Sequence, residues 1–304
     1  MSYNHTTVLL EEAVQALCVR PGMTIIDGTL GGGGHSEKIA ELLSGSGMLH
    51  GFDVDIEAIE ASKRRLCRYD NVSFHHANYA DMADYVSSAD GLVLDLGYSS
   101  HHVDTERRGF SFHFENADID MRMSGSGLSA YDIVNGYDES ELARILFRYG
   151  DEKHSRSIAR GIVKARQAAP IKTTGELAEI IRSNVPISYR NASHPARKSF
   201  QAIRIETNSE FTNISRGIRS GFELLNNGGR LAVISFHSTE DALVKGIFAE
   251  FTAGCSCDKR LPVCVCGIAP RAVSVVRKPI VPSAGEIERN NRARTAKLRV
   301  LEKC

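Results

Sequence analysis

The sequence predicts an α/β fold: a mostly parallel sheet covered by helices on both faces, with an inserted, mostly helical domain. Strand and helix patterns alternate through the first hundred residues, which is typical of parallel strands joined by crossover helices. About 130 residues then separate the fourth strand from the next buried one, far more than one crossover helix uses. A second domain is therefore inserted between them.

The predicted strands are short apolar segments. We expect one ending at Asp27, followed by strands over residues 48–53, 72–75, 92–96 and 230–235, with final strands over 273–276 and 297–301. The last two are expected to add an antiparallel, hairpin-like extension at the sheet edge. Helices are expected from about Ser36 to Leu43 and over residues 56–66, the second with Asp55 as its N-cap.

The insertion is predicted to be helical because it holds two capping boxes, Asp138 with Glu141 and Thr173 with Glu176. After it, a long helix over residues 200–225 is expected to return the chain to the sheet. The predicted organisation is a first part of the sheet domain over residues 1–104, the inserted domain over 105–199 and the second part over 200–304.

Composition indicates a soluble globular protein. Apolar residues make up 42% and charged residues 24% of the chain, and no apolar run approaches the roughly 18 residues of a membrane span. The amino terminus lacks a signal pattern, which favours a cytoplasmic location and no membrane association. Seven cysteines, an odd number, do not suggest a secreted disulfide framework.

Charge is balanced overall but not locally. The 37 basic residues equal the 37 acidic ones, yet residues 153–204 hold 11 basic and only 2 acidic residues, a net charge of +9. Such a local field favours binding of nucleic-acid phosphates. A solvated helical face is the alternative.

A glycine-rich turn, IIDGTLGGGGHS at residues 25–36, joins the first strand to a helix and predicts a cofactor loop. The dinucleotide pattern G-x-G-x-x-G is not completed in either register, and no Gly-Lys-Ser/Thr of a P-loop follows. Asp27 would repel a pyrophosphate but suits a ligand with ammonium and sulfonium charges. This pattern predicts S-adenosylmethionine.

Further site residues are expected where strands end. Asp53 ends the second strand, where a ribose-binding carboxylate belongs; the alternative role for this residue is that of a helix N-cap. Tyr79 suits stacking on adenine or a place in the core equally well. Asp95 ends the fourth strand and would be costly to bury without a partner, with His102 a few residues on; a capping role for Asp95 is the alternative.

Several motifs together resemble the bacterial small-subunit ribosomal RNA cytosine-N4 methyltransferases, the MraW or RsmH family. They are His5-Thr6-Thr7-Val8-Leu9-Leu10, Asp27-Gly28-Thr29 with Gly33-Gly34-His35-Ser36, Asp95-Leu96-Gly97 with Ser99-Ser100, Arg108-Gly109-Phe110-Ser111-Phe112, Asp120-Met121-Arg122-Met123, His194-Pro195-Ala196, Phe200-Gln201-Ala202, and Ile234-Ser235-Phe236-His237-Ser238 with Glu240-Asp241. The matching blocks run from His5 to about Arg299, and they imply a class I S-adenosylmethionine-dependent methyltransferase fold, Rossmann-like.

The resemblance also implies site residues. The cofactor contacts it implies are Gly33, Gly34, His35, Asp53, Tyr79, Asp95 and His102. This chain has Tyr79 where the family often has Phe, which preserves stacking, and His101-His102 where the family commonly has Pro-Gln. Imidazole can supply the hydrogen bond expected from the second of these positions.

The activity implied is methylation of the exocyclic N4 of one cytidine in the decoding region of 16S ribosomal RNA, within the small subunit or its precursor. We expect Asp95 to act as a cofactor contact and as the catalytic acceptor for the amine, since positioning and electrostatics do most of this chemistry. Substrate contacts are expected from Arg108, Phe110, Arg122 and His237. The alternatives are a core position for Phe110 and a structural role for His237.

Two C-x-C pairs, Cys255 with Cys257 and Cys264 with Cys266, are the one candidate metal cluster. Their spacing is imperfect for zinc, so we predict that no metal is required. Three other functions stay open: a nicotinamide-dependent oxidoreductase, a non-catalytic RNA-binding or assembly factor on the same scaffold, and a DNA amino-methyltransferase. The oligomeric state is also open, with a homodimer as one alternative.

Overall fold

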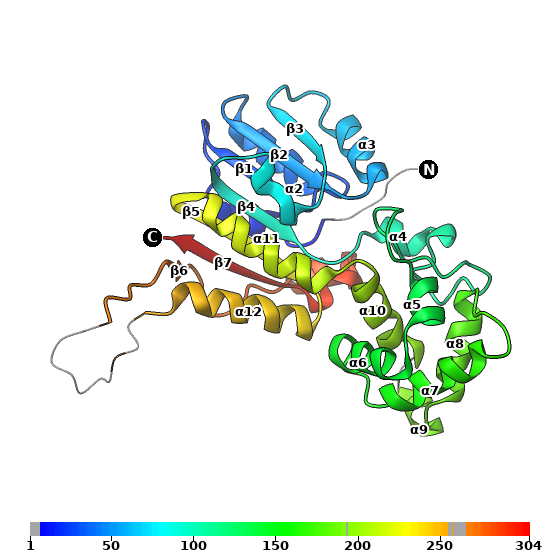
Figure 1. Ribbon diagram of the computed structural model, residues 1–304. Coiled ribbons are helices and arrows are strands. Elements are labelled where there is room, and N and C mark those ends of the chain that lie inside the picture. Colours follow the sequence, from blue (N-terminus) through cyan, green and yellow to red (C-terminus); the bar gives the residue numbers. More distant parts are fainter. Residues whose placement is uncertain (1–6, 193, 255–256, 258–265) are drawn as a thin grey trace. The chain divides into compact units, whose positions relative to one another are not determined.

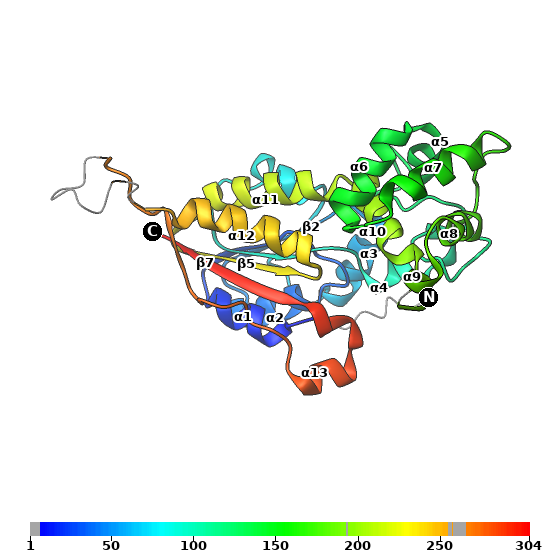
Figure 2. The ribbon, with the colours of Figure 1, turned by 90° about the horizontal axis from the view of Figure 1, so that it is seen from below.

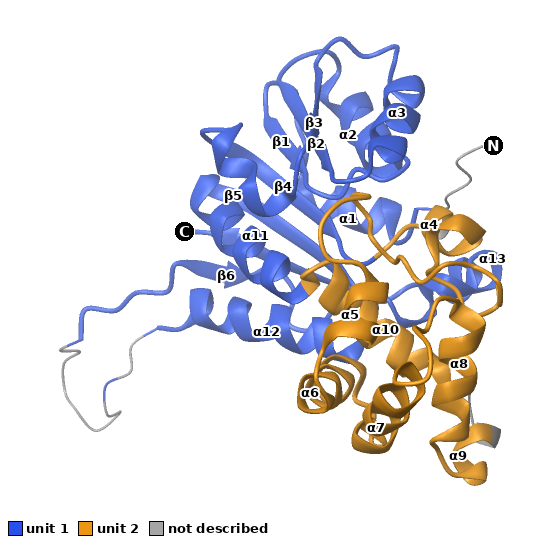
Figure 3. Ribbon diagram, turned by 45° about the vertical axis from the view of Figure 1, so that its right-hand side comes forward, with its two compact units in different colours: residues 1–97, 211–304 blue, residues 98–210 orange. Residues whose placement is uncertain are grey.

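The structure is a computed structural model that describes residues 7–192, 194–254, 257 and 266–304. The chain divides into two compact units (Figure 3). Unit 1 comprises residues 1–97 and 211–304, and unit 2 comprises residues 98–210. The boundaries predicted for the inserted domain, residues 105 and 199, both lie inside unit 2, which begins seven residues earlier and ends eleven residues later.

Unit 1 is built on a sheet whose described strands follow the order β3-β2-β1-β4-β5-β7-β6. The strands are β1 (Thr24–Asp27), β2 (Met48–Asp53), β3 (Val72–His76), β4 (Ala89–Asp95), β5 (Leu225–Ser235), β6 (Ala272–Ser274) and β7 (Lys297–Lys303). Strands β1 to β5 pair in parallel, whereas β7 is antiparallel to both β5 and β6. The predicted α/β fold and its antiparallel extension are confirmed, although β6 ends at Ser274 rather than at residue 276.

Helices cover both faces of this sheet (Figures 1 and 2). Unit 1 holds α1 (Leu10–Leu17), α2 (Gly34–Leu43), α3 (Ile56–Arg65), η1 (Tyr79–Asp84), α11 (Glu210–Leu224), α12 (Ser238–Thr252), α13 (Ala284–Arg289) and η3 (Asn291–Thr295). Residues of β4 alternate between the two faces: Leu92 and Leu94 pack with α11 and α12, and Val93 packs with α1 and α2. The strand is therefore buried on both sides, as a parallel crossover sheet requires.

Unit 2 is mostly helical and has its own apolar core. It holds α4 (Ser100–Asp104), η2 (Glu106–Arg108), α5 (Ala130–Gly136), α6 (Glu139–Gly150), α7 (Ser155–Arg166), α8 (Thr174–Ser183), α9 (Ile187–Ala192) and α10 (Ala196–Thr207). The capping boxes predicted at Asp138 and Thr173 are confirmed at the starts of α6 and α8.

The prediction of a single helix over residues 200–225 was wrong. The structure has two helices, α10 and α11, separated by a break at Asn208 and Ser209. Ser209 adopts a left-handed backbone conformation, with φ of 49°, which an α-helix does not accommodate. The side chain of Asn208 accepts a hydrogen bond from the Met123 amide (2.8 Å) and donates one to the Met121 carbonyl (2.8 Å). A tertiary contact therefore accompanies the break.

Across the part of the chain that the structure describes, no helix combines the length and the apolar character needed to cross a membrane.

Candidate functional site

The motif segments that contain Asp27 and Asp95 meet at the carboxyl edge of the sheet. Asp27 ends β1 and Asp95 ends the neighbouring strand β4. The Asp95 amide donates to the Thr29 hydroxyl (2.6 Å), and the Gly28 amide donates to the Val93 carbonyl (3.0 Å). These bonds hold the turn after β1 beside the end of β4, where open α/β sheets bind ligands. Thr29 is a positioning residue that the sequence reasoning did not single out.

Asp53, at the end of β2, holds the glycine loop. Its carboxylate accepts hydrogen bonds from the Gly31 amide and from the Asp55 amide, both at 2.8 Å. The predicted N-cap role of Asp55 is confirmed, because its side chain accepts from the Glu57 amide (3.0 Å). Asp53 is thus not the cap of α3, and its carboxylate is fixed at the sheet edge beside the loop.

The glycines of the loop are needed for two reasons. Gly33 has φ of 75°, a conformation that favours glycine, and it is the N-cap of α2, which begins at Gly34 rather than near Ser36 as predicted. At Gly34 a Cβ atom would lie 1.7 Å from the Thr7 hydroxyl oxygen, so the missing side chain makes room for the segment before α1. The remainder of that motif, His5 and Thr6, lies outside the described residues.

Asp27 is a buried carboxyl group with two donors. Its side chain is 1% exposed and accepts from the Ser36 hydroxyl (2.7 Å) and the Thr29 amide (3.2 Å). Burial raises the pKa of Asp27 to about 6, because the hydrogen bonds only partly offset the loss of water. His35 is buried in the same first turn of α2, with 4% exposure.

Asp95 is less well satisfied. Its Oδ1 atom is buried and has no hydrogen-bond partner among the residues that the structure describes. Burial raises the pKa of Asp95 well above its usual range, and the nearby carboxylates of Asp27 and Glu240 raise it further. A buried carboxylate without a partner is costly, so this arrangement favours a ligand that brings positive charge or N–H donors.

The acidic edge and the glycine loop fit S-adenosylmethionine. Its ammonium and sulfonium charges match the excess of carboxyl groups at Asp27 and Asp95, and its ribose hydroxyls match an acceptor such as Asp53. The same carboxyl groups would oppose a pyrophosphate.

Tyr79 lies after β3 at the start of η1 and is half-buried. Its side chain packs directly against two glycines: a Cβ atom at Gly28 would lie 3.0 Å from the Tyr79 Cβ, and one at Gly217 would lie 2.3 Å from the Tyr79 Cδ2. Tyr79 therefore joins the turn after β1 to α11.

His237 has the structural role that was the alternative to substrate contact. It is the N-cap of α12, and its Nδ1 accepts from the Glu240 amide (3.3 Å). The Glu240 carboxylate in turn accepts from the amides of Phe236 (2.9 Å) and His237 (3.3 Å), and its Oε1 lies 2.7 Å from the His237 Nε2. The spacing His-x-x-Glu, read as a capping box, was the available signal.

The other predicted site residues, His102, Arg108, Phe110 and Arg122, belong to unit 2. His102 is buried, and its Nδ1 accepts from the Ser99 amide (3.2 Å) at the start of α4. The Phe110 ring stacks on the His102 ring, with centroids 5.1 Å apart and planes 19° apart. Phe110 also stacks on Tyr98 at 6.1 Å, so it is neither a deep core residue nor an isolated surface ring.

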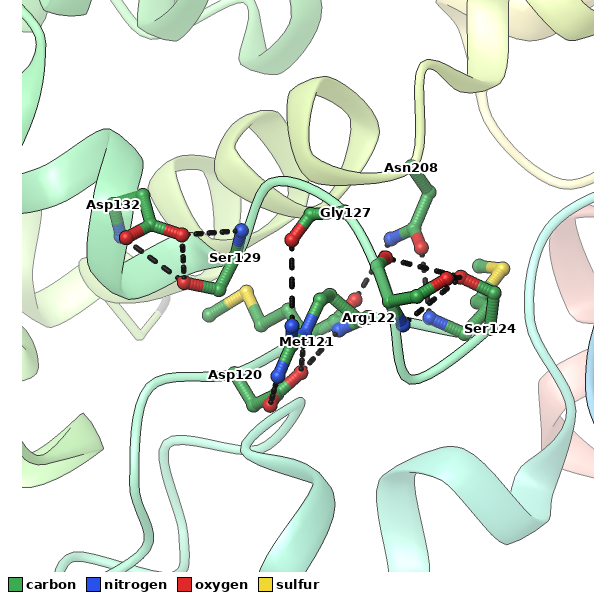
Figure 4. Close-up of polar contacts among 10 residues, drawn as sticks. Asp120, Met121, Arg122, Ser124, Gly127, Ser129, Asp132 and Asn208 are labelled. Atoms are coloured by element: carbon green, nitrogen blue, oxygen red, sulfur yellow. Dashed lines mark hydrogen bonds and ion pairs between the residues drawn. The ribbon is translucent and has the colours of Figure 1, made fainter.

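Arg122 is held by its own loop (Figure 4). Its guanidinium and amide donate to the Asp120 carboxylate at 2.7 to 2.9 Å, and Nη1 donates to the Gly127 carbonyl (3.3 Å). Burial opposes ionisation of Asp120, but the hydrogen bonds from Arg122 outweigh it and lower the Asp120 pKa. Arg108 braces the same loop by donating to the Met123 carbonyl (3.3 Å).

The basic carboxyl-terminal strand has intramolecular partners. Lys297 (3.0 Å) and Arg299 (2.7 Å) both contact the Asp241 carboxylate near the start of α12. Strand β7 lies between β5 and β6 in the sheet, so it is not an edge strand. Of the candidate metal ligands, Cys255 and Cys264 lie outside the described residues. Within the described ranges, no three His, Cys, Asp or Glu side chains gather in a way that would hold a metal ion.

Comparison with known proteins gives full-length matches. A relative from Clostridium botulinum (strain Kyoto / Type A2) is 46% identical over 309 residues, covering 100% of both chains. Relatives from Brevibacillus brevis (46% identical; 100% of this chain and 99% of the other covered) and Pelobacter propionicus (47%; 99% of each) match similarly. All three are named ribosomal RNA small subunit methyltransferase H.

Among solved structures, a putative methyltransferase from Streptococcus mutans in complex with SAH is similar at a TM-score of 0.48 and 13% identity, covering 98% of this chain and 99% of that one. A family model described as the MraW methylase family matches residues 2–304. The chain therefore belongs to the MraW methylase family and is an S-adenosylmethionine-dependent methyltransferase.

Proposed function

We propose that this protein methylates the exocyclic N4 of one cytidine in the decoding region of 16S ribosomal RNA, within the small subunit or its precursor, in the cytoplasm. The relatives named ribosomal RNA small subunit methyltransferase H, which match over the full length, support the RNA class of the substrate. The observation that carries the chemistry is the buried Asp95 Oδ1, which has no hydrogen-bond partner within the described residues.

The residues proposed to hold S-adenosylmethionine are Gly33, Gly34, His35, Asp53, Tyr79, Asp95 and His102. When bound, the cofactor supplies a methyl group activated by its sulfonium charge. Asp53 is oriented for a ribose by the amides of Gly31 and Asp55. The carboxyl groups of Asp27 and Asp95 provide the negative charge that a cationic ligand requires, and such a ligand in turn favours their ionised forms.

Asp95 is the proposed catalytic residue because its free acceptor suits an amine. The lone pair of the cytosine N4 amine is delocalised into the ring, so this nitrogen is a weak nucleophile. A carboxylate oxygen that accepts one N–H favours a pyramidal nitrogen and can take up the proton that the nitrogen loses as it gains the methyl group. The preorganised position of Asp95, fixed through Thr29, supplies the alignment.

The target base must leave its stack to reach a buried methyl donor, so flanking nucleotides need to be held. The net charge of +9 over residues 153–204, within unit 2, provides attraction for phosphates. Arg108, Phe110, Arg122 and His237 are the proposed substrate contacts. For Arg122, binding to Asp120 leaves part of the guanidinium available, since the side chain keeps 28% exposure.

The experiment combines the protein with S-adenosylmethionine carrying a labelled methyl group and with small ribosomal subunits that lack the modification. We expect one methyl per subunit at a cytidine N4 in the decoding region, located by nuclease digestion and mass spectrometry. Asp95→Ala is the matched inactive control. Labelling at another nucleotide, or none on a correctly assembled substrate, would reject the proposed specificity. Tight binding of NAD, or labelling of DNA alone, would favour the competing enzyme classes.

A further inference from the structure

Helix α7 of unit 2 has an outer face of basic residues with no acidic neighbour on the same helix. Its sequence, SRSIARGIVKAR, contains no Asp or Glu. Ile158, Ala159 and Ile162 are buried in the core of unit 2, which fixes the orientation of the helix. Arg156, Arg160 and Lys164 are exposed, and their spacing of four residues places them in one row on the opposite side.

The row does not stabilise the helix. A helix amino terminus favours acidic side chains, yet α7 has none in its first turn and carries Arg156 there, and its N-cap His154 makes no side-chain capping bond. Arg166 on the same helix behaves differently, since it donates to the carbonyls of Val134 (2.7 Å) and Tyr137 (2.6 Å). Arg166 is therefore a structural cation of α7, whereas Arg156, Arg160 and Lys164 face outward.

Several basic residues of unit 1 are paired with acidic side chains. Lys38 pairs with Glu41 (3.4 Å), Lys63 with Glu60 (2.9 Å) and Arg68 with Glu37 (3.2 Å). On α7, Arg160 alone has an acidic group nearby, Glu139 at 3.5 Å, and that contact is weakened by water because Arg160 is 74% exposed. For Arg156 and Lys164, no acidic group lies within 4 Å in the described part of the chain.

We propose that Arg156, Arg160 and Lys164 form a track for the phosphate backbone of RNA. This assignment rests on the proposed function and specifies where unit 2 holds the substrate. Three cations spread over roughly 12 Å of helix match a chain of evenly spaced negative charges. No large apolar side chain is exposed on α7, whereas a protein partner would need an apolar contact at the centre of its interface. RNA is therefore the occupant that the row favours.

The test is the variant Arg156→Gln/Arg160→Gln/Lys164→Gln. Its control, Lys38→Gln/Lys63→Gln/Arg68→Gln, removes the same charge from acid-paired positions of unit 1. Binding of a fluorescein-labelled 16S ribosomal RNA fragment is measured between 50 and 300 mM salt. We expect affinity to fall roughly 10- to 100-fold at 0.1 M salt and the slope of log affinity against log salt to decrease by about 2. The control should stay within about twofold of the wild type.

Methylation of small subunits separates this assignment from the proposed function. In the α7 variant, KM should rise while kcat, the affinity for S-adenosylmethionine and the melting temperature stay unchanged. Unchanged RNA binding in the α7 variant, or equal losses in both triple variants, would overturn the track. Polyglutamate serves as an acidic polypeptide probe, and an α7 variant that lost binding to polyglutamate but not to RNA would also overturn it. If the wild type binds RNA through this row but modifies no cytidine N4, the proposed function fails and the track stands.

Discussion

Arg204 and Glu210 form a buried ion pair with two hydrogen bonds, Nε to Oε1 at 2.7 Å and Nη2 to Oε2 at 2.9 Å. Their side chains are only 7% and 9% exposed. The Arg204 guanidinium also lies 4.2 Å from the centroid of the Tyr98 ring. Tyr98 and Glu210 are the first and last residues of unit 2. Arg204 therefore ties together the two chain segments at which this unit begins and ends.

Removing one member of this pair is expected to destabilise the protein strongly. Glu210→Gln removes the carboxylate that pairs with this buried guanidinium, and breaking a buried ion pair typically costs about 3–5 kcal/mol. The control is Glu250→Gln, which breaks the exposed pair with Arg219 and is expected to change the free energy of unfolding very little, because water screens that pair. Urea unfolding followed by circular dichroism measures both. Equal, small effects of the two substitutions would show that the buried pair contributes little.

Local signals in the sequence predicted local structure well. The capping boxes at Asp138 and Thr173 and the cap at Asp55 were predicted because each depends on residues within three positions of one another. The parallel sheet was predicted from the alternation of strands and helices, and the carboxyl-edge placement of Asp27, Asp53 and Asp95 followed from it.

What the sequence did not reveal depends on contacts between distant segments. The helix predicted over residues 200–225 is broken beside Asn208, whose partners lie 85 and 87 residues earlier. The contact of Gly34 with Thr7 and the bond from the Asp95 amide to Thr29 are also tertiary. The residue types that reveal a site can be identified from a pattern, but the partners that position them cannot.

Asp27 should make the stability of the ligand-free protein depend on pH. Its pKa is about 6 in the folded protein, against 3.8 for an ordinary Asp, so the folded state binds the proton more tightly. This favourable contribution is present below about pH 4 and is lost as pH rises through 6, a loss on the order of 3 kcal/mol by pH 7. Asp27→Asn should remove it.

The measurement is the difference in unfolding free energy between Asp27→Asn and the wild type from pH 4 to pH 8. The variant should be relatively more stable at pH 7 than at pH 4. Its affinity for S-adenosylmethionine at pH 8 should be about 10- to 100-fold weaker, because a charged hydrogen-bonding group is lost. A difference in unfolding free energy that does not change with pH would contradict the raised pKa.

Gly34→Ala should disturb the cofactor loop through the amino-terminal segment. The added Cβ would lie 1.7 Å from the Thr7 hydroxyl oxygen and 2.9 Å from the Thr7 Cβ. We expect lower thermal stability and weaker cofactor binding, although alanine is intrinsically favoured over glycine in a helix by about 1 kcal/mol. In a Thr7→Gly background the same substitution should be much less harmful, which a double-mutant cycle measures.

Gly246→Ala is the matched control for that substitution. Gly246 lies inside α12, and beyond the neighbouring backbone of that helix no described atom is within 4 Å of the position its Cβ would take. This variant should gain up to about 1 kcal/mol and keep normal cofactor binding. If Gly34→Ala gave the same gain, the Thr7 contact would not constrain the loop.

Substitutions at His237 separate its structural role from its proposed substrate contact. His237→Ala removes the N-cap of α12 and should cost about 1 kcal/mol, whereas asparagine is a strong N-cap residue and should recover most of that loss. If the ring also contacts substrate, His237→Asn should remain at least about tenfold below the wild type in kcat/KM at a temperature where both are fully folded. Wild-type activity in His237→Asn would assign His237 to the helix cap alone. The asparagine side chain can accept a hydrogen bond from the Glu240 amide, but it cannot reproduce a contact between the imidazole ring and RNA.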